Sequence, residues 1–229
     1  AELWRVGRDE KSNWSTPFVW QHPLGSELVT PGTIKTRSYG LDGRLLWELA
    51  GASEITIATP YAAHGLLYVS SGFVLDRQQP IWAIKPGARG DITLAKNATE
   101  NAFIAWSLPD SAPYNPSTLV YGDELYVLSD RGLLACYDAH TGRQHYRKAR
   151  LSGGRAFTAS PWAYNGHVFC ASEYGETFAV RAGRNFEVVA LNPLGEDEML
   201  MASPAIAAGR LFIRTGRRLY CLEQPPQLE

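Results

Sequence analysis

The stretch NPSTLVYGDELYVLSDRGLLACYDAHTGRQHY at residues 115–146 decides the fold, because it is one copy of a repeat. Each copy has a Ser, Thr or Asn followed by Pro, then a few small or apolar residues, a turn and a strand-like triplet. The prolines of successive copies are 43, 56, 45 and 43 residues apart. A period of about 40–45 residues filled with short strands is typical of a β-propeller with one four-stranded blade per repeat. The copies begin at Thr16-Pro17, Thr59-Pro60, Asn115-Pro116, Ser160-Pro161 and Ser203-Pro204.

Three further strands are predicted in most copies, because β-branched and aromatic residues alternate there with Gly and Asp turns. Second strands are predicted at 27–29, 67–69, 125–127, 167–169 and 211–213, and third strands at 38–42, 81–84, 134–138, 178–180 and 219–222. An aromatic residue marks several fourth strands, as at Trp47, Trp106 and Tyr146. One column of the third strand is small throughout, which indicates that adjacent blades pack closely there. This column contains Gly40, Ala83, Cys136, Ala179 and Cys221.

We therefore predict an all-β chain with one domain over residues 1–229, a five-bladed β-propeller of four-stranded antiparallel blades. Its last blade lacks a fourth strand, and Leu3-Trp4-Arg5-Val6 matches the fourth-strand pattern. We expect this segment to close the ring by completing that blade, which would remove two open sheet edges. The alternative is an excerpt of a longer propeller. The predicted blades are residues 15–50, 57–108, 114–150, 158–192 and 201–223 plus 2–7, with residues 1–8 as the closing strand.

Composition argues against several classes of function but does not identify one. The net charge of −1 and the pI near 6.6 argue against nucleic-acid binding, which requires a basic stripe. No run of about 18 apolar residues occurs, so no membrane span is predicted. Three cysteines are too few for a disulfide scaffold, and we interpret them as small apolar residues. We expect a monomer, and composition leaves the compartment open.

One irregular stretch, Lys85 to Asn101, explains the long step of 56 residues. It contains several turn residues and is predicted as an extended loop between the third and fourth strands of blade two. Loops of this length often have a role. We interpret it as a solvent-exposed insertion without chemistry, and its role stays open.

The repeat resembles the quinoprotein-type propeller family. The resemblance is carried by Pro116, Leu125-Tyr126-Val127, Ala135-Cys136-Tyr137-Asp138, Thr141-Gly142 and Tyr146, and it extends over nearly the whole chain. It implies a propeller fold and a periplasmic or secreted location. The family includes dehydrogenases that use pyrroloquinoline quinone (PQQ) with calcium, and cofactor-free relatives such as the outer-membrane assembly lipoprotein propeller. The chain looks most like bacterial members that have no known activity.

Departures from the dehydrogenases decide what this resemblance implies about chemistry. Those enzymes have about eight blades, often an adjacent cysteine pair, and a calcium site with a catalytic Asp. This chain has five repeats and no Cys-Cys pair, and no Asp or Glu can be matched to the calcium position. We therefore predict no catalytic residue, no cofactor and no metal site. His22, His64 and His167 lie in predicted turns between first and second strands, and a metal site would need more ligands to converge there.

A ligand site is expected where loops enter the first strands and join the second to the third strands, because these loops share one face around the central channel. Aromatic residues with convergent charges are typical of a small-ligand or peptide site. The alternative is an ordinary polar rim. The candidates are Lys11, Trp14, Lys35, Tyr114, Asp130, Arg155, Phe157, Glu173 and Arg214.

These observations favour a non-catalytic binding or scaffold propeller that presents this face to a protein, a peptide or a small ligand. The first alternative is a PQQ-dependent dehydrogenase or a degenerate descendant, with Trp14 or Tyr114 stacking on the quinone. The second is a five-bladed glycan-binding or glycan-active protein, in which Glu54, Asp130 and Glu173 could supply paired carboxylates. Whether the chain is an enzyme stays open, and the balance of evidence is against it.

Overall fold

The computed structural model describes residues 1–195 and 198–223. Over these ranges the chain is all β, and its strands form five sheets. Three sheets have four strands, the first has a fifth strand, and the last has three. The predicted arrangement of five successive β-blades is therefore present. No helix in these ranges is long and apolar enough to cross a membrane.

The strands follow the chain from blade one to blade five. Blade one contains β1 (Phe18–His22), β2 (Gly25–Pro31), β3 (Lys35–Gly40), β4 (Leu45–Ala50) and the added β8 (Gly90–Asp91). Blade two contains β5 (Tyr61–Ala63), β6 (Leu66–Ser70), β7 (Ile81–Ile84) and β9 (Ile104–Leu108). Blade three contains β10 (Leu119–Tyr121), β11 (Glu124–Leu128), β12 (Leu133–Asp138) and β13 (Gln144–Arg150). Blade four contains β14 (Trp162–Tyr164), β15 (His167–Ala171), β16 (Glu176–Arg181) and β17 (Val188–Pro193), and blade five contains β18 (Ala205–Ala207), β19 (Arg210–Arg214) and β20 (Leu219–Glu223).

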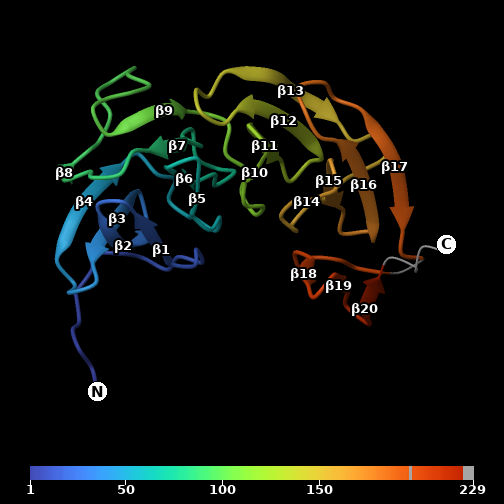
Figure 1. Ribbon diagram of the computed structural model, residues 1–229, viewed down its shortest axis with the longest axis horizontal. Helices are drawn as coiled ribbons and strands as arrows, with labels where there is room; N and C mark the ends of the chain where they lie inside the picture. The colour runs from blue at the N-terminus through green and yellow to red at the C-terminus, as the bar shows by residue number, and fades with distance from the viewer. Residues whose placement is uncertain (196–197, 224–229) are drawn as a thin grey trace.

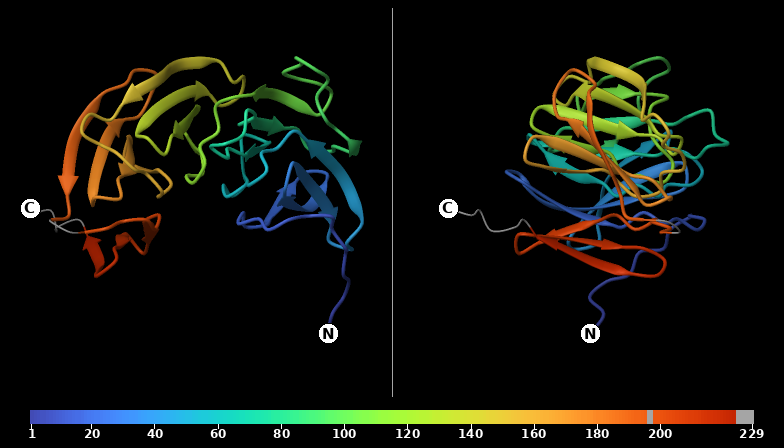
Figure 2. Two further views of the ribbon diagram at one scale, coloured as in Figure 1. Left: turned by 180° about the vertical axis from the view of Figure 1, so that it is seen from behind. Right: turned by 90° about the vertical axis from the view of Figure 1, so that its right-hand side faces the viewer.

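The blades form an open arc, with blades one and five at its two ends (Figure 1). The reverse view shows the same separation between these blades (Figure 2). The predicted ring closure is therefore wrong in this structure. Residues 3–6 form no strand, and among the described residues β20 pairs only with β19. The physical reason is the small rotation between neighbouring blades, which carries the fifth blade through only part of a circle and leaves β20 far from the N-terminal segment.

Trp4 nevertheless contacts blade one in the way that a fourth-strand aromatic residue contacts the next blade. Its indole N–H donates to the carbonyl of Leu41 at 2.8 Å, and a Cβ built on Gly43 would lie 2.8 Å from its ring. Trp106 of β9 makes the corresponding contacts with blade three, through the carbonyl of Ala139 at 3.0 Å and through Gly142. Residue 4 thus makes the contact of a fourth-strand aromatic residue with blade one, a contact that the sequence did not predict, without belonging to a strand.

The column of small residues on the third strands faces large residues on the second strands. The register pairs Ala83 with Tyr68, Cys136 with Tyr126, Ala179 with Phe169, Cys221 with Phe212 and Gly40 with Glu27. A large side chain therefore always lies beside a small one across the strand pair, which lets both pack at normal density. The predicted close approach between blades also exists at Cys136, whose thiol lies 3.6 Å from the carbonyl of Gly183 in blade four.

Residues beside four of the repeat prolines form a belt of hydrogen bonds that links blades two to five. The backbone N–H of Thr59 donates to the hydroxyl of Ser117, which follows Pro116, at 3.0 Å. The N–H of Ser117 donates to the hydroxyl of Ser160 at 2.9 Å, and the N–H of Ser160 donates to the hydroxyl of Ser203 at 2.9 Å. A serine hydroxyl beside the proline thus supplies an acceptor for a backbone N–H of the preceding blade.

The hydrophobic cores lie between successive blades and not within single blades. The first core joins Trp20 and Trp47 of blade one to Leu67 and Trp82 of blade two. Equivalent cores join blades two and three, three and four, and four and five. Each blade is therefore stabilised mainly by its neighbours, as expected for a repeat architecture.

The insertion at 85–101 is not the free loop that the sequence predicted. It returns to blade one, where β8 pairs in parallel with β4, and Ile92 is buried in the first core. Its Arg89 also donates to the buried carboxylate of Glu27 at 3.1 Å. Ala88 and Ile92, both buried in the first core, hold the insertion against its neighbour, because their burial removes apolar surface from water.

Candidate functional site

The loop face consists of the loops that enter the first strands and the loops that join the second to the third strands. Backbone hydrogen bonds hold these loops to one another along the arc. Ile34 N–H donates to Ser53 O at 3.1 Å, Phe157 N–H to Asp130 O at 3.0 Å, Glu173 N–H to Ala156 O at 2.8 Å and Gly216 N–H to Met199 O at 2.8 Å. The predicted candidates therefore lie on loops that are fixed in place by their own backbone.

Asp130 and Tyr114, two predicted candidates, are brought together by a structural contact. The Asp130 carboxylate accepts hydrogen bonds from the backbone N–H of Tyr114 at 2.9 Å and of Asn115 at 3.0 Å, and from the Asn115 side chain at 2.7 Å. The ring of Tyr114 packs against Phe73, with 5.4 Å between ring centroids. Asp130 thus fixes the loop that enters blade three.

Glu173 has a similar role in blade four, and Asp76 in blade two. The Thr158 hydroxyl donates to Glu173, and the backbone N–H of Glu54 donates to Asp76. An acid in the loop between second and third strands therefore caps the entering loop in three neighbouring blades. The carboxylates that suggested a binding site from the sequence act here to rigidify the face.

Phe157 is a core residue, whereas the sequence suggested a ligand-facing one. It is 1% exposed and packs against Phe178 with 6.0 Å between ring centroids. A Cβ built on Gly132 would lie 2.6 Å from its ring. A fully apolar ring gains free energy by burial, and the glycines of the surrounding loops leave room for it beneath the face.

Lys11 borders a polar pocket of 640 Å³ between blades one and two. Its ammonium lies 3.0 Å from the Glu54 carboxylate, and both side chains are largely exposed. A backbone hydrogen bond and the Arg37 guanidinium hold the pKa of Asp9, at the same pocket, below its ordinary value. The pocket is lined by Asp9, Lys11, Thr33, Ile34, Ala52, Glu54, Asp76, Arg77 and Gln78. Its charges are of both signs, so it favours a zwitterionic or amide-rich ligand over a simple ion.

Lys35 and Arg37, on β3, are engaged with acids rather than with this pocket. Lys35 pairs with Glu48 of β4 at 3.1 Å, and Arg37 pairs with Asp9 at 2.7 Å and with Glu10. The Arg37 pairs fasten the N-terminal segment to blade one, and the Lys35 pair joins β3 to β4. Lys35 is therefore better explained as a structural residue than as a ligand contact.

Arg155 and Arg214 lie at the other end of the arc. The Arg155 guanidinium stacks over the Tyr174 ring at 4.7 Å from the ring centroid, a cation–π geometry. Tyr174 also lines a pocket of 520 Å³ between blades four and five, beside Met199. Arg214 borders a smaller pocket that Met199 and Met201 also line. The predicted candidates thus divide between two regions of the face.

Seven large apolar side chains on loops of this face are exposed: Trp14, Ile34, Val74, Leu75, Tyr174, Met199 and Met201. Of these, Leu75 is 81% exposed and Trp14 is 61% exposed. Trp14 is among the predicted candidates, whereas the other six are not. The sequence contains no signal for these six, because an apolar residue in a predicted loop can be buried, as Phe157 is, or exposed.

Residues 1–223 match the model of a family described as outer membrane protein assembly factor BamB. The match includes nearly the whole chain. The chain belongs to this family.

Solved structures show the same fold at low sequence identity. BamB from Moraxella catarrhalis is 15% identical, with a TM-score of 0.61 over 90% of this chain and 57% of that chain. The computationally designed Ika8 protein is 12% identical, with a TM-score of 0.57 over 82% of this chain and 52% of that chain. This BamB-family chain therefore spans little more than half the length of either structure. No curated protein matches it.

Several residues of this BamB-family chain that the quinone alternative would use are engaged in contacts of their own. Asp130 and Glu173 use carboxylate oxygens to cap loops, and Tyr114 packs on Phe73. Trp14, the other candidate for stacking on a quinone, is 61% exposed.

Of the acids that the glycan alternative would use, Glu54 pairs with Lys11 at 3.0 Å, and Asp130 and Glu173 accept hydrogen bonds from their own loops.

Proposed function

We propose that this chain is a non-catalytic protein-interaction scaffold whose loop face binds a segment of a partner protein without a cofactor. The observation that carries the proposal is the set of seven exposed apolar side chains on loops of that face. Exposed apolar groups rimmed by polar residues are typical of protein-binding surfaces. Peptide groups of a partner also suit the mixed charges of the pocket that Lys11, Glu54 and Arg77 line.

The rigidity of the loops supports binding of this kind. The capping acids and the loop-to-loop hydrogen bonds hold the face in one conformation before a partner arrives. A preordered surface loses less conformational entropy on binding, so more of the contact energy appears as affinity. Aromatic and Met residues are enriched at such interfaces, and Trp14, Tyr174 and Met199 are of these types.

The family description supports a cellular context for the proposal. Members are described as outer membrane protein assembly factors. We therefore propose that the chain acts on the periplasmic side of an outer membrane and that its partners take part in protein assembly there. This context is separate from the binding face itself, because the face is argued from exposed residues and the context from family membership.

Photo-crosslinking tests the binding face with a matched pair of tyrosines in blade four. Tyr174 is 53% exposed on the loop face, and Tyr164 is 57% exposed at the end of β14 on the opposite side. A benzophenone amino acid replaces each residue in turn in native cells. We expect a specific crosslinked partner from position 174 and none from position 164. Crosslinks from position 164 alone, or from neither position, would overturn the proposal.

A second variant checks that the crosslink depends on the apolar surface. In the chain with the crosslinker at position 174, Met199→Asp places a charge beside it without altering a buried residue, because Met199 is 55% exposed. We expect this change to remove the crosslinked product while leaving the thermal midpoint within a few degrees of the parent. An undiminished product would show that the apolar residues do not form the interface.

A further inference from the structure

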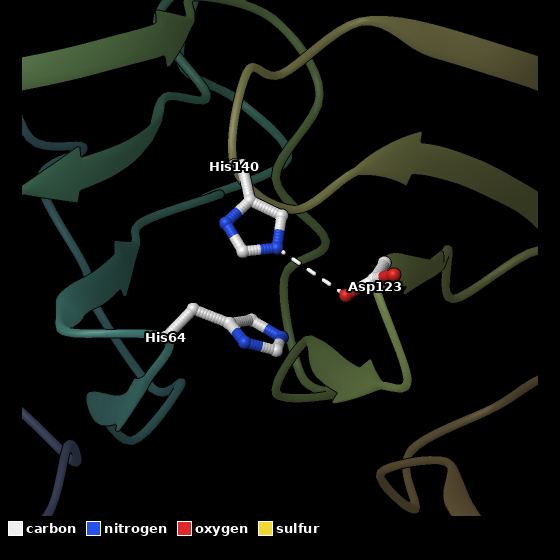
Figure 3. Close-up of side chains that lie close together, drawn as sticks. All are labelled: His64, Asp123 and His140. Atoms are coloured by element: carbon white, nitrogen blue, oxygen red, sulfur yellow. Dashed lines mark hydrogen bonds and ion pairs between the residues drawn. The ribbon is translucent and has the colours of Figure 1, made fainter.

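Three metal-ligating side chains converge on the face opposite the loop face, at the boundary between blades two and three (Figure 3). His64 lies in the turn between β5 and β6, Asp123 in the turn between β10 and β11, and His140 in the turn between β12 and β13. One ligand atom from each side chain lies within 4.8 Å of the others. All three residues are exposed, so an ion can reach them from solvent.

The distances among these side chains suit one small cation. His140 Nε2 lies 3.3 Å from Asp123 Oδ1, and the imidazole rings of His64 and His140 lie 4.4 Å apart between centroids. Two ligand atoms bound tetrahedrally at about 2.0–2.1 Å from zinc are separated by about 3.3 Å. We propose that His64, Asp123 and His140 form a binding site for a divalent transition-metal ion of the zinc class.

A hydrogen bond to the backbone orients His64 for this role. Its Nε2 lies 2.9 Å from the carbonyl oxygen of Gly122, and since a carbonyl can only accept, Nε2 carries the hydrogen. This hydrogen bond holds the His64 ring beside the turn that carries Asp123. Hydrogen bonds that orient the ring of a ligating histidine are usual around protein-bound zinc.

The turn that carries His140 is fixed by buried groups from both blades. The carbonyl of Ala139 accepts hydrogen bonds from Tyr68 OH and Trp106 Nε1, each at 3.0 Å. The N–H of Ala139 donates to the carbonyl of Asp123 at 2.8 Å. The backbone therefore holds two of the three ligands next to each other, which lowers the entropic cost of ordering the site.

The donor set selects the class of ion. Imidazole nitrogens favour zinc, copper and nickel, whereas magnesium and calcium prefer sets made of oxygen alone. Three protein ligands leave one tetrahedral position for water or for a donor from another molecule. Bound metal would also connect blade two to blade three, because the ligands come from both.

No metal site is predicted from the sequence, because the histidines near turns between first and second strands belong to different blades. These are His22, His64 and His167, in blades one, two and four. His140 follows a third strand, and only the packing of blade two on blade three places it beside His64. This inference is independent of the proposed protein-binding face, which lies on the other side of the blades.

Isothermal titration of the full chain with zinc chloride tests the site. We expect one equivalent of zinc to bind the parent chain, and His64→Gln or His140→Gln to weaken binding by more than about 100-fold, since losing even an outer partner costs about 10–100-fold. Asp123→Asn should weaken it at least about 10-fold. His167→Gln is the matched control, and it should bind zinc as the parent does. His167 is the first residue of β15, directly after the turn of blade four that corresponds to the turn of His64, and its ring lies 2.8 Å from a backbone carbonyl.

The other outcomes each refute the proposal. Absence of zinc binding by the parent chain, equal binding by His64→Gln and the parent, or equal loss in His167→Gln would each do so. Magnesium chloride is titrated in parallel and should give no heat of binding. A thermal scan separates binding from misfolding, because zinc should raise the thermal midpoint of the parent and of His167→Gln but not that of His64→Gln.

Discussion

Replacement of Trp106 by Ala tests whether the chain is held together at the boundaries between blades. Trp106 is 5% exposed, belongs to the core between blades two and three, and donates to Ala139 O at 3.0 Å. Removing a buried Trp side chain costs about 3–5 kcal/mol, because it leaves a cavity. In a chain of this size each kcal/mol lowers the thermal midpoint by about 2–4 °C, so the loss should be about 6–20 °C.

Trp4→Ala is the matched control, because Trp4 makes the same two contacts in a more exposed place. Its indole donates to Leu41 O at 2.8 Å and rests on Gly43, but the residue is 38% exposed. The loss should therefore be close to one net hydrogen bond, about 1 kcal/mol. This corresponds to about 2–4 °C in the thermal midpoint.

Differential scanning calorimetry measures both variants without relying on tryptophan fluorescence, which each variant alters. We expect Trp106→Ala to lose at least about three times as much free energy of unfolding as Trp4→Ala. Equal losses would show that burial between blades does not determine the free-energy cost of removing the side chain. A broadened or split transition in Trp106→Ala would still agree with the argument, because repeats stabilised by their neighbours can separate when one boundary is weakened.

Three further predictions concern buried polar groups. Burial raises the pKa of the Cys136 and Cys170 thiols to about 12, and Cys221 is exposed, so a thiol reagent should label one cysteine in the folded chain and three in denaturant. Burial also raises the pKa of Tyr68 from 10.0 to about 12. Because the unfolded chain releases this proton at a lower pH, the stability present below about pH 10 should fall as the pH rises toward 12. Urea melts should show this fall in the parent and a smaller one in Tyr68→Phe. Glu27→Ala should lower the free energy of unfolding by about 3–5 kcal/mol in the same melts, because several buried or half-buried donors lose their acceptor.

The blades could be predicted from the sequence because the repeated residues make the hydrogen bonds and packing contacts that recur from blade to blade. A serine beside the proline supplies the hydroxyl that accepts from the preceding blade, as at Ser160 and Ser203. The small third-strand residue must face a large second-strand residue, as Ala83 faces Tyr68. A requirement that recurs in each blade produces a periodic pattern, and a periodic pattern can be read from one sequence.

Ring closure and the insertion could not be predicted in the same way. Closure depends on the small rotation between neighbouring blades, summed over the arc, and no single residue encodes that angle. The insertion at 85–101 occurs once, so no repeat shows its partner, and only the burial of Ile92 and the pairing of β8 with β4 reveal it. The loop-capping contacts of the charged candidates Asp130 and Glu173 could not be predicted, because a sequence does not show which N–H and hydroxyl groups need an acceptor.

The two proposed binding sites contain residues that do not follow the repeat. His64, Asn165 and Ala208 occupy equivalent turns, and all three adopt a left-handed backbone conformation before a glycine, with φ of 52°, 46° and 49°. The fold fixes the conformation of this turn but accepts three different side chains there, so the side chain is free to acquire a role. In blade two it is an imidazole that meets His140 from the next blade. The loop face follows the same principle, because its capping acids recur from blade to blade while its exposed apolar residues, such as Trp14 and Leu75, occur without a period. Residues that depart from the repeat without a structural requirement are therefore the ones that carry the two proposed binding functions.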